Sequence, residues 1–258
     1  MWKALRISIL LLVLLFVSVS TWLTQARSTD WEDSLWIKVY PINGDGSDES
    51  RRYIANLDVD DFDDIESFVE REIRKYGHTL SRPVRMELGR EILEQPPSVG
   101  DAPGALDIML WSLKIRWWAG RVAGPQDDPA PDVRVFVRYH APLDSIQLEN
   151  SVGLQKGMVG VVNAFAGRRW SGTNNVIIAH EFLHTLGATD KYDPATGMPD
   201  FPLGYAEPDR SPRHPQRYAE IMGGRIARTE QEAIIPQSLK YVTIGPQTAA
   251  EIQLVEAD

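Results

Sequence analysis

The sequence predicts an α+β protein with a mixed, twisted sheet, a buried helix and an irregular C-terminal lobe, preceded by an N-terminal hydrophobic segment. Three observations support this class. Strand and helix patterns alternate between residues 35 and 165, an almost wholly apolar helix pattern runs from Val176 to Leu186, and six prolines interrupt residues 192–215. We expect one domain over residues 27–258, with an upper lobe at about 31–187 and a lower lobe at about 188–258.

Composition and charge limit the classes of function. The 258 residues are 43% apolar and 24% charged, an ordinary composition for one globular domain. The formal net charge of −9 repels a phosphate backbone, so nucleic acid is not an expected partner. The chain has no cysteine, which excludes disulfides, thiolate metal ligands and a cysteine nucleophile. Any bound metal must therefore be held by His, Asp or Glu.

The first 26 residues form a targeting or anchoring segment. Lys3 and Arg6 precede a nearly unbroken apolar run at residues 7–23, and small residues suited to cleavage follow at 24–26. The pattern is typical both of a cleaved signal peptide and of a retained membrane anchor, and a cytosolic N-terminal helix is the less favoured alternative. Both interpretations place the rest of the chain outside the cytoplasm, either secreted or periplasmic, or anchored to the membrane.

Apolar periodicity predicts the first half of the domain. A strand at 35–42 ends in the Asn-Gly-Asp-Gly sequence at 43–46, which we interpret as a solvated turn. A helix follows, with acidic residues at 60–64 that suit its N-terminus and Gly77 at its end. Next come a strand at 84–88, a loop at 96–104 and a helix at 107–119, whose three tryptophans we interpret as core residues.

The following segments complete the predicted sheet. Residues 120–132 are rich in Gly, Pro and Asp and read as a mobile surface loop, and a strand follows at 133–139. Three glycines among branched apolar residues at 151–165 indicate a bent strand or hairpin. Such a strand could border a cleft and pair there with an extended peptide.

The segment at residues 174–193 contains the candidate metal-binding and catalytic residues. It contains His180, Glu181 and His184 in the order H-E-x-x-H, followed by Gly187 and Asp190. Two histidines four residues apart lie about 40° apart around a helix and one turn along it, so both imidazoles can reach one metal ion. A glutamate beside the ion can take a proton from water, the arrangement expected of a zinc hydrolase. The alternative is a helix with two hydrogen-bonded core histidines.

The segment H-E-F-L-H-T-L-G-A-T-D resembles the metzincin branch of zinc metallopeptidases, in the version of the snapalysin type that has aspartate as third ligand. The resemblance implies a zincin-like catalytic domain in which His180, His184 and Asp190 bind zinc and Glu181 is the general base. It also implies that Gly187 ends the helix and turns the chain back, because glycine tolerates the left-handed conformation.

A second motif supports the resemblance. Metzincins carry a methionine turn beneath the metal, and the sequence A-E-I-M-G-G at residues 219–224 resembles one, with Met222 as its methionine. Together the two motifs span residues 174–224, about a fifth of the chain.

Two roles stay open in the sequence. No tyrosine stands two residues after Met222, where some metzincins supply an oxyanion donor; the candidates for that role are Tyr192, Tyr218, Lys191 and His214. The spacing favours Asp190 as third ligand. The alternatives for this ligand are Glu207, Glu220, Asp193 and His214.

The lower lobe is predicted to be irregular. The prolines at 192–215 stiffen a long connection that would wrap one side of a cleft. A short turn or helix is expected from 236–239, and a C-terminal helix at 248–255 behind a Gly-Pro pair.

The motif and the N-terminal segment together lead us to expect a zinc-dependent hydrolase that cleaves peptide bonds of a peptide or protein substrate outside the cytoplasm. Two alternatives remain. One is an exported binding or structural domain in which zinc, held by four protein ligands, only stabilises the fold. The other is a zinc hydrolase that acts on a non-peptide bond.

Overall fold

The computed structural model describes residue 6 and residues 29–98, 104–124, 127–142, 152–154 and 158–255. The predicted apolar segment at 7–23 lies outside these residues. Within the described ranges, no helix is both long enough and apolar enough to span a membrane.

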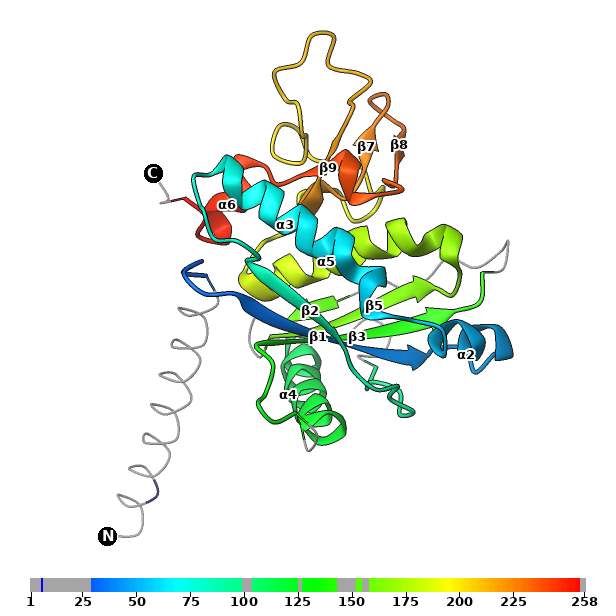
Figure 1. Cartoon of the computed structure of the whole chain (residues 1–258). Coiled ribbons are helices and arrows are strands. Elements are labelled where there is room, and N and C mark those ends of the chain that lie inside the picture. The colour runs from blue at the N-terminus through cyan, green and yellow to red at the C-terminus, as the bar shows by residue number, and fades with distance from the viewer. Residues whose placement is uncertain are drawn as a thin grey trace.

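A five-stranded sheet forms the centre of the molecule, in the order β2-β1-β3-β5-β4 (Figure 1). Four strands are parallel: β2 (Val84–Leu88), β1 (Leu35–Asn43), β3 (Val133–His140) and β5 (Val159–Phe165). The edge strand β4 (Val152–Leu154) pairs antiparallel with β5. The predicted mixed sheet is therefore confirmed, and the segment expected to be a bent strand or hairpin is an antiparallel pair.

Helices connect two pairs of parallel strands: α2 (Asp48–Ile54) and, after a 3₁₀ turn at Val59–Phe62, α3 (Asp63–Lys75) stand between β1 and β2, and α4 (Ala105–Val122) stands between β2 and β3. Helix α5 (Ser171–Leu186) follows β5. Neighbouring parallel strands need such crossover connections, so the architecture is mixed α/β. The expected α+β class is corrected in this respect. Strand patterns in a sequence give no direction of pairing, and the order of elements was consistent with both arrangements.

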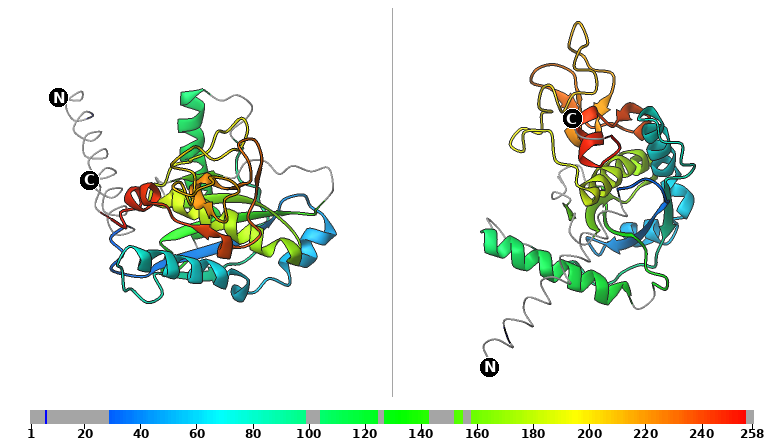
Figure 2. Two further views of the ribbon diagram at one scale, coloured as in Figure 1. Left: turned by 90° about the horizontal axis from the view of Figure 1, so that it is seen from above. Right: turned by 90° about the vertical axis from the view of Figure 1, so that its left-hand side faces the viewer.

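The sheet is covered on both faces. Helices α3 and α5 lie on one face and α4 lies on the other, as Figures 1 and 2 show. Strand β3 contributes to both cores, because successive side chains of a strand point to opposite faces. Val135 and Val137 belong to the core beneath α3 and α5, whereas Phe136 packs with Ile115 and Trp118 of α4.

Three local expectations are corrected. Helix α2 was not anticipated; Ser47 caps it by accepting a hydrogen bond from the backbone N–H of Ser50. In α4, Trp118 is buried as expected, but Trp117 is 68% exposed because it lies on the far side of the helix. The loop after α4 is not merely a surface loop. Its Asp127 is buried and binds Tyr40, Arg134 and Lys38.

The C-terminal lobe consists of short elements beyond α5, at the top of Figure 1. They are β6 (Ala219–Glu220) with β9 (Val242–Thr243), β7 (Ile226–Ala227) with β8 (Ala233–Ile234), and α6 (Pro246–Glu251). The C-terminal helix thus begins and ends earlier than predicted, and a 3₁₀ turn at Leu239–Tyr241 stands just after the predicted start of a turn.

Two glycines allow the proline-rich connection to pack against the predicted methionine turn. A Cβ atom on Gly223 would lie 2.3 Å from the carbonyl oxygen of Gly204. One on Gly204 would lie 2.1 Å from the carbonyl oxygen of Lys191. Side chains at these positions would collide with backbone, so the lower lobe closes only because both are glycine.

Candidate metal centre

Two asparagines hold α5 in place. The side chain of Asn174 accepts a hydrogen bond from the backbone N–H of Phe165 at 3.2 Å and donates to its carbonyl oxygen at 2.9 Å. Asn175 donates to the carbonyl oxygen of Asp61 at 2.8 Å. These bonds join the first turn of the helix to the end of β5 and to the segment before α3. His180 and His184, six and ten residues after Asn174, therefore have a fixed position over the sheet.

His180, His184 and Asp190 converge on one point. The two Nε2 atoms lie 3.1 Å apart, and Oδ1 of Asp190 lies 3.2 Å from Nε2 of His180 and 3.1 Å from Nε2 of His184. Tetrahedral zinc with bonds of about 2.0–2.1 Å separates its ligand atoms by roughly 3.3 Å. The three atoms therefore have the spacing of one face of a zinc coordination tetrahedron.

Hydrogen bonds at the other ring nitrogens fix the tautomer of both histidines. Nδ1 of His180 lies 2.8 Å from the carbonyl oxygen of Ile221, and Nδ1 of His184 lies 2.8 Å from that of Ala188. A carbonyl oxygen only accepts, so each Nδ1 carries the hydrogen and each neutral Nε2 presents a lone pair. In the neutral rings, two such lone pairs and a carboxylate oxygen point to one place, a donor set that fits a divalent cation.

The short distances among these side chains shift the pKa values of His180 and Asp190. Burial lowers the pKa of His180, but the adjacent carboxylates of Asp190 and Glu181 and the Ile221 carbonyl outweigh burial and raise it. Burial raises the pKa of Asp190, yet the imidazoles of His180 and His184 beside its carboxylate reverse this and lower it well below its ordinary value. Asp190 is therefore an anion at neutral pH, as a carboxylate ligand must be.

Glu181 lies beside this triangle. Its side chain is buried, and one of its carboxylate oxygens is within 4.8 Å of a ring nitrogen of each histidine. Its Cβ atom is 4.0 Å from the position of a Cβ on Gly160 of β5, so the glutamate packs between α5 and the sheet. A carboxylate in this place can exchange a proton with a molecule held next to the three donor atoms.

Gly187 has the backbone role that the sequence predicts. It caps α5 in a left-handed conformation with φ of +112°. The backbone N–H groups of Gly187 and Ala188 donate to the carbonyl oxygens of His184 and Leu183, which closes the helix. The turn aims the Ala188 carbonyl at His184 and returns the chain so that Asp190 reaches both histidines.

The predicted methionine turn lies beneath the histidines. Met222 is fully buried in a 3₁₀ turn at Ile221–Gly223. The preceding Glu220 is also fully buried, and its carboxylate accepts hydrogen bonds from the backbone of Met222, Gly223 and Gly245 and from the hydroxyl of Thr248. Glu220 is thus a residue that shapes the turn, a role that the sequence analysis missed because its four donors come from two segments of the fold.

One of the four candidate oxyanion donors adjoins the triangle. The Tyr192 ring centre is 6.3 Å from that of His180, and the tyrosine hydrogen-bonds to Asp190. The others have different partners. Lys191 is buried against Glu251 and the Thr189 carbonyl, His214 binds the Tyr205 hydroxyl, and the Tyr218 ring faces Arg217.

The alternative third ligands are also engaged elsewhere. Glu207 binds Arg217 and Glu220 shapes the methionine turn. Asp193 accepts from the backbone of Ala195 and the hydroxyl of Thr196. Of the five residues considered from the sequence, Asp190 is the one whose oxygen the structure brings to both histidines.

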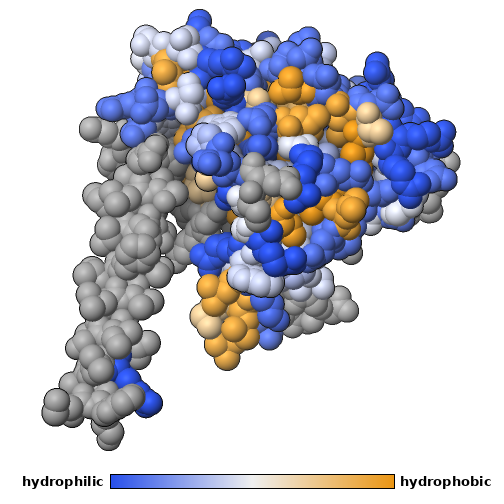
Figure 3. All heavy atoms as spheres, turned by 60° about the horizontal axis from the view of Figure 1, so that its bottom comes forward, coloured by the Kyte–Doolittle hydropathy of each residue, from blue (hydrophilic) through white to orange (hydrophobic). Residues whose placement is uncertain are grey.

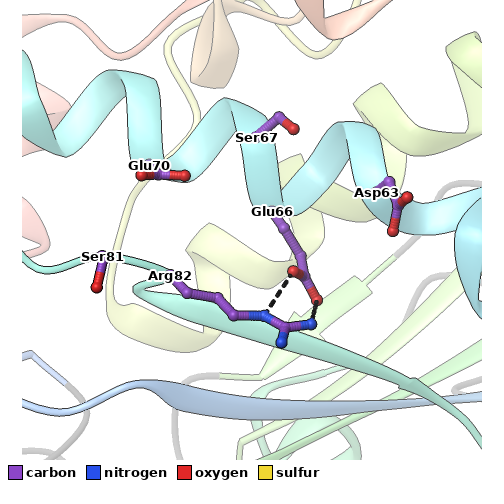
Figure 4. Close-up of a pocket in the computed structure, with 6 residues that line it drawn as sticks. All are labelled: Asp63, Glu66, Ser67, Glu70, Ser81 and Arg82. Carbon is purple, nitrogen blue, oxygen red and sulfur yellow. Dashed lines mark hydrogen bonds and ion pairs between the residues drawn. The ribbon is translucent and has the colours of Figure 1, made fainter.

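A surface hollow elsewhere is lined by Asp63, Glu66, Ser67, Glu70, Ser81 and Arg82 (Figure 4). Arg82 points across it to the Glu66 carboxylate, with Nε 3.0 Å from Oε2. This hollow, between α3 and the segment before β2, contains none of the predicted site residues.

Comparisons with known proteins leave the family open. No family model and no curated protein matches the sequence. Among solved structures, one described as a chaperone–substrate complex is similar to this chain, with 15% identity and a TM-score of 0.41. The match covers 86% of this chain and 34% of the other chain. A second is a catalytically inactive OgpA from Akkermansia muciniphila in complex with an O-glycopeptide, with 12% identity and a TM-score of 0.35. This match covers 86% of this chain and 63% of the other chain. This chain thus spans less than two thirds of either protein, and at these TM-scores neither likeness assigns a function.

Proposed function

We propose that this chain is a zinc-dependent metallopeptidase of the metzincin type, with zinc held by His180, His184 and Asp190. The observation that carries the proposal is the triangle of three lone-pair donors, 3.1–3.2 Å apart, whose histidine tautomers are set by backbone carbonyls. Holding two imidazole lone pairs and a carboxylate together in a partly buried place costs free energy, and a bound cation would offset that cost.

Zinc in this position supplies Lewis-acid chemistry, because it lowers the pKa of water and polarises a carbonyl group. The protein supplies the proton transfers. Glu181, fixed between α5 and β5, accepts a proton from the attacking water and delivers it to the leaving amine. Its buried position limits the number of rotamers and keeps the carboxylate beside the reacting atoms.

Tyr192 is the best candidate for stabilising the oxyanion. Burial and the neighbouring carboxylates of Asp190 and Glu181 raise the pKa of its phenol. The hydroxyl therefore keeps its proton at neutral pH and can donate it in a hydrogen bond to a developing negative charge. Its position two residues after Asp190 brings the centre of its ring to 6.3 Å from that of His180.

The sheet edge favours a peptide as the substrate. β4 is one of the two edge strands of the sheet and lies against α5. An extended peptide can add to such an edge through main-chain hydrogen bonds, which would bring its backbone alongside α5, the helix that carries His180 and His184. The apolar run at residues 7–23 is the sequence feature that supports an activity outside the cytoplasm.

The test is metal analysis of the purified chain followed by an assay on an unfolded protein substrate. We expect about one zinc per chain and cleavage that a chelator abolishes and added zinc restores. Circular dichroism on the chelated protein serves as the control, because a catalytic zinc can leave while the sheet remains folded.

Two results would contradict the proposal. If the chain unfolds when zinc is removed and cleaves nothing when zinc is present, the metal is structural. If zinc-dependent hydrolysis occurs with ester substrates but with no peptide, the enzyme acts on a non-peptide bond.

A further inference from the structure

Helix α4 has two apolar faces, of which the sheet covers one. Ile115, Trp118, Ala119 and Val122 are buried against the sheet. The opposite face is formed by five large apolar side chains that are 49 to 70% exposed: Leu106, Met109, Leu110, Leu113 and Trp117. Their spacing of i, i+3, i+4, i+7 and i+11 makes a continuous stripe along three turns.

This stripe, which we call the outer face of α4, is unusual for a surface helix. Such a helix normally turns polar residues to water on the side opposite its core face. Figure 3 shows the apolar residues gathered where α4 projects at the lower edge of the molecule. Apolar side chains clustered on a protruding element indicate a surface that binds another apolar phase.

The charges beside the outer face suit an anionic partner. Within α4, Lys114, Arg116 and Arg121 accompany a single acidic residue, Asp107, although the whole chain carries a net charge of −9. Arg121 also pairs with Glu94 of the segment before α4, which leaves Lys114 and Arg116 as the basic side chains of this helix that pair with no acidic side chain among the described residues. The Arg121 guanidinium lies 5.0 Å from the Trp117 ring centre, at the side of the stripe. An apolar stripe with a tryptophan and flanking basic residues is the pattern of helices that lie in a membrane interface.

The length of the N-terminal connection allows such a contact. Thr29 donates a hydrogen bond to Gln253 at 2.9 Å and Trp31 donates to the Ile252 carbonyl at 2.8 Å, so the chain is tied to the domain from residue 29 onward. Five residues, 24–28, separate this point from the apolar run at 7–23. A connection of that length spans about 20 Å at most, which would keep an anchored domain next to the bilayer.

We infer that the outer face of α4 inserts into the headgroup region of an anionic membrane and orients the domain on it. The basic side chains then contact lipid phosphates, while Trp117 and the leucines enter the acyl boundary. Helix α4 lies on one face of the sheet and α5 on the other, so the metal centre stays on the side that faces away from the lipid (Figures 1 and 2).

A second copy of this chain fits the outer face less well. Specific dimers bury about 20–30 residues on each partner, whereas this stripe has five side chains on one projecting helix.

The chain has no cysteine, so one introduced cysteine can be labelled uniquely. We would place an environment-sensitive fluorophore on Leu113→Cys or Leu110→Cys in the full chain, reconstituted into vesicles of phosphatidylcholine and phosphatidylglycerol. The matched control is Leu203→Cys, because Leu203 is 52% exposed and Leu113 is 54% exposed. Leu203 belongs to the C-terminal lobe, which lies at the top of Figure 1, whereas α4 lies at the bottom.

We expect brominated lipids to quench the label at 113 and iodide in the buffer to quench it several-fold less than the label at 203. Vesicles of phosphatidylcholine alone should weaken both effects, because they lack anionic headgroups. Equal iodide quenching at 113 and 203 would overturn the inference. Protection of 113 from iodide without quenching by brominated lipids would also overturn it, since the outer face would then be covered by protein.

Discussion

Nδ1 of His180 lies 2.8 Å from the carbonyl oxygen of Ile221, a residue 41 positions later in the chain. This bond sets the ring orientation of a proposed zinc ligand from a turn whose next residue is the buried Met222. Partners of this kind typically change metal affinity by about 10- to 100-fold when they are removed. The Glu220 carboxylate holds this turn by accepting hydrogen bonds from the backbone of Met222 and Gly223. The proposed zinc affinity therefore depends on the folding of the lower lobe.

Glu181→Gln should keep zinc and lose hydrolysis by about 10²- to 10⁴-fold, because the amide cannot accept the proton from water. Zinc content by atomic absorption and initial rates on an unfolded protein measure the two effects. Glu207→Gln is a suitable control, since Glu207 binds Arg217 and does not contact the proposed ligands. Full activity in Glu181→Gln would remove this residue from the mechanism.

Asp190→Ala should weaken zinc binding by more than about 100-fold, since it removes a ligand and not only a partner of one. Competition with a fluorescent zinc chelator measures the dissociation constant. The neighbouring variant Asp193→Ala is the control, because Asp193 only caps a turn through Ala195 and Thr196. If both variants bind zinc equally well, Asp190 is not the third ligand.

Gly187→Ala should lower the free energy of unfolding by about 1–3 kcal/mol, because alanine is strained at a φ of +112°. The same change should weaken zinc binding, since the strained turn carries the Ala188 carbonyl that orients His184. Urea unfolding and zinc titration test the two parts. Gly120→Ala is the matched control: Gly120 lies within α4 and a Cβ there meets no atom within 4 Å. It should be neutral or stabilise the protein by up to about 1 kcal/mol.

Glu220→Gln should lower the free energy of unfolding by at least about 2 kcal/mol. Backbone N–H groups of Met222, Gly223 and Gly245 now donate to its carboxylate. The NH₂ group of glutamine would replace one of the accepting oxygens and leave buried N–H groups without an acceptor. Thr248→Val, which removes one hydroxyl donor from the same carboxylate and keeps the side-chain shape, should cost less. Equal costs in urea unfolding would mean that the Thr248 bond dominates and that the backbone bonds of Glu220 contribute little.

Asp45 predicts a dependence of stability on pH. Partial burial raises its pKa, but hydrogen bonds from the backbone N–H groups of Ser47 and Ala141 outweigh burial and lower the pKa from 3.8 to about 2. A lowered pKa in the folded state means that the stabilisation is present above pH 3.8 and is lost as the pH falls toward 2. Asp45→Asn should therefore reduce the melting temperature at neutral pH and have little effect near pH 2. An equal loss at both pH values would contradict this.

The position of the main elements could be predicted from local patterns. Alternating apolar residues located β1, β2 and β3, and the apolar run at Val176–Leu186 located α5, because side-chain periodicity depends on the local backbone alone. The parallel direction of the strands could not be predicted, since each pairing joins segments that are distant in sequence. Helix α2 was missed because it is short and begins directly after a turn.

For the candidate site, the sequence alone determined that His180 and His184 share one face of a helix and that Gly187 suits its end, since both follow from helix geometry and backbone sterics. Only the tertiary structure shows that Asp190, and not one of the other three acids or His214, lies next to both imidazoles, because each needs a return of the chain whose path depends on packing. The same holds for Glu220 and for the outer face of α4. An apolar helix pattern gives the side chains their directions, but only the position of the sheet decides which of them it covers.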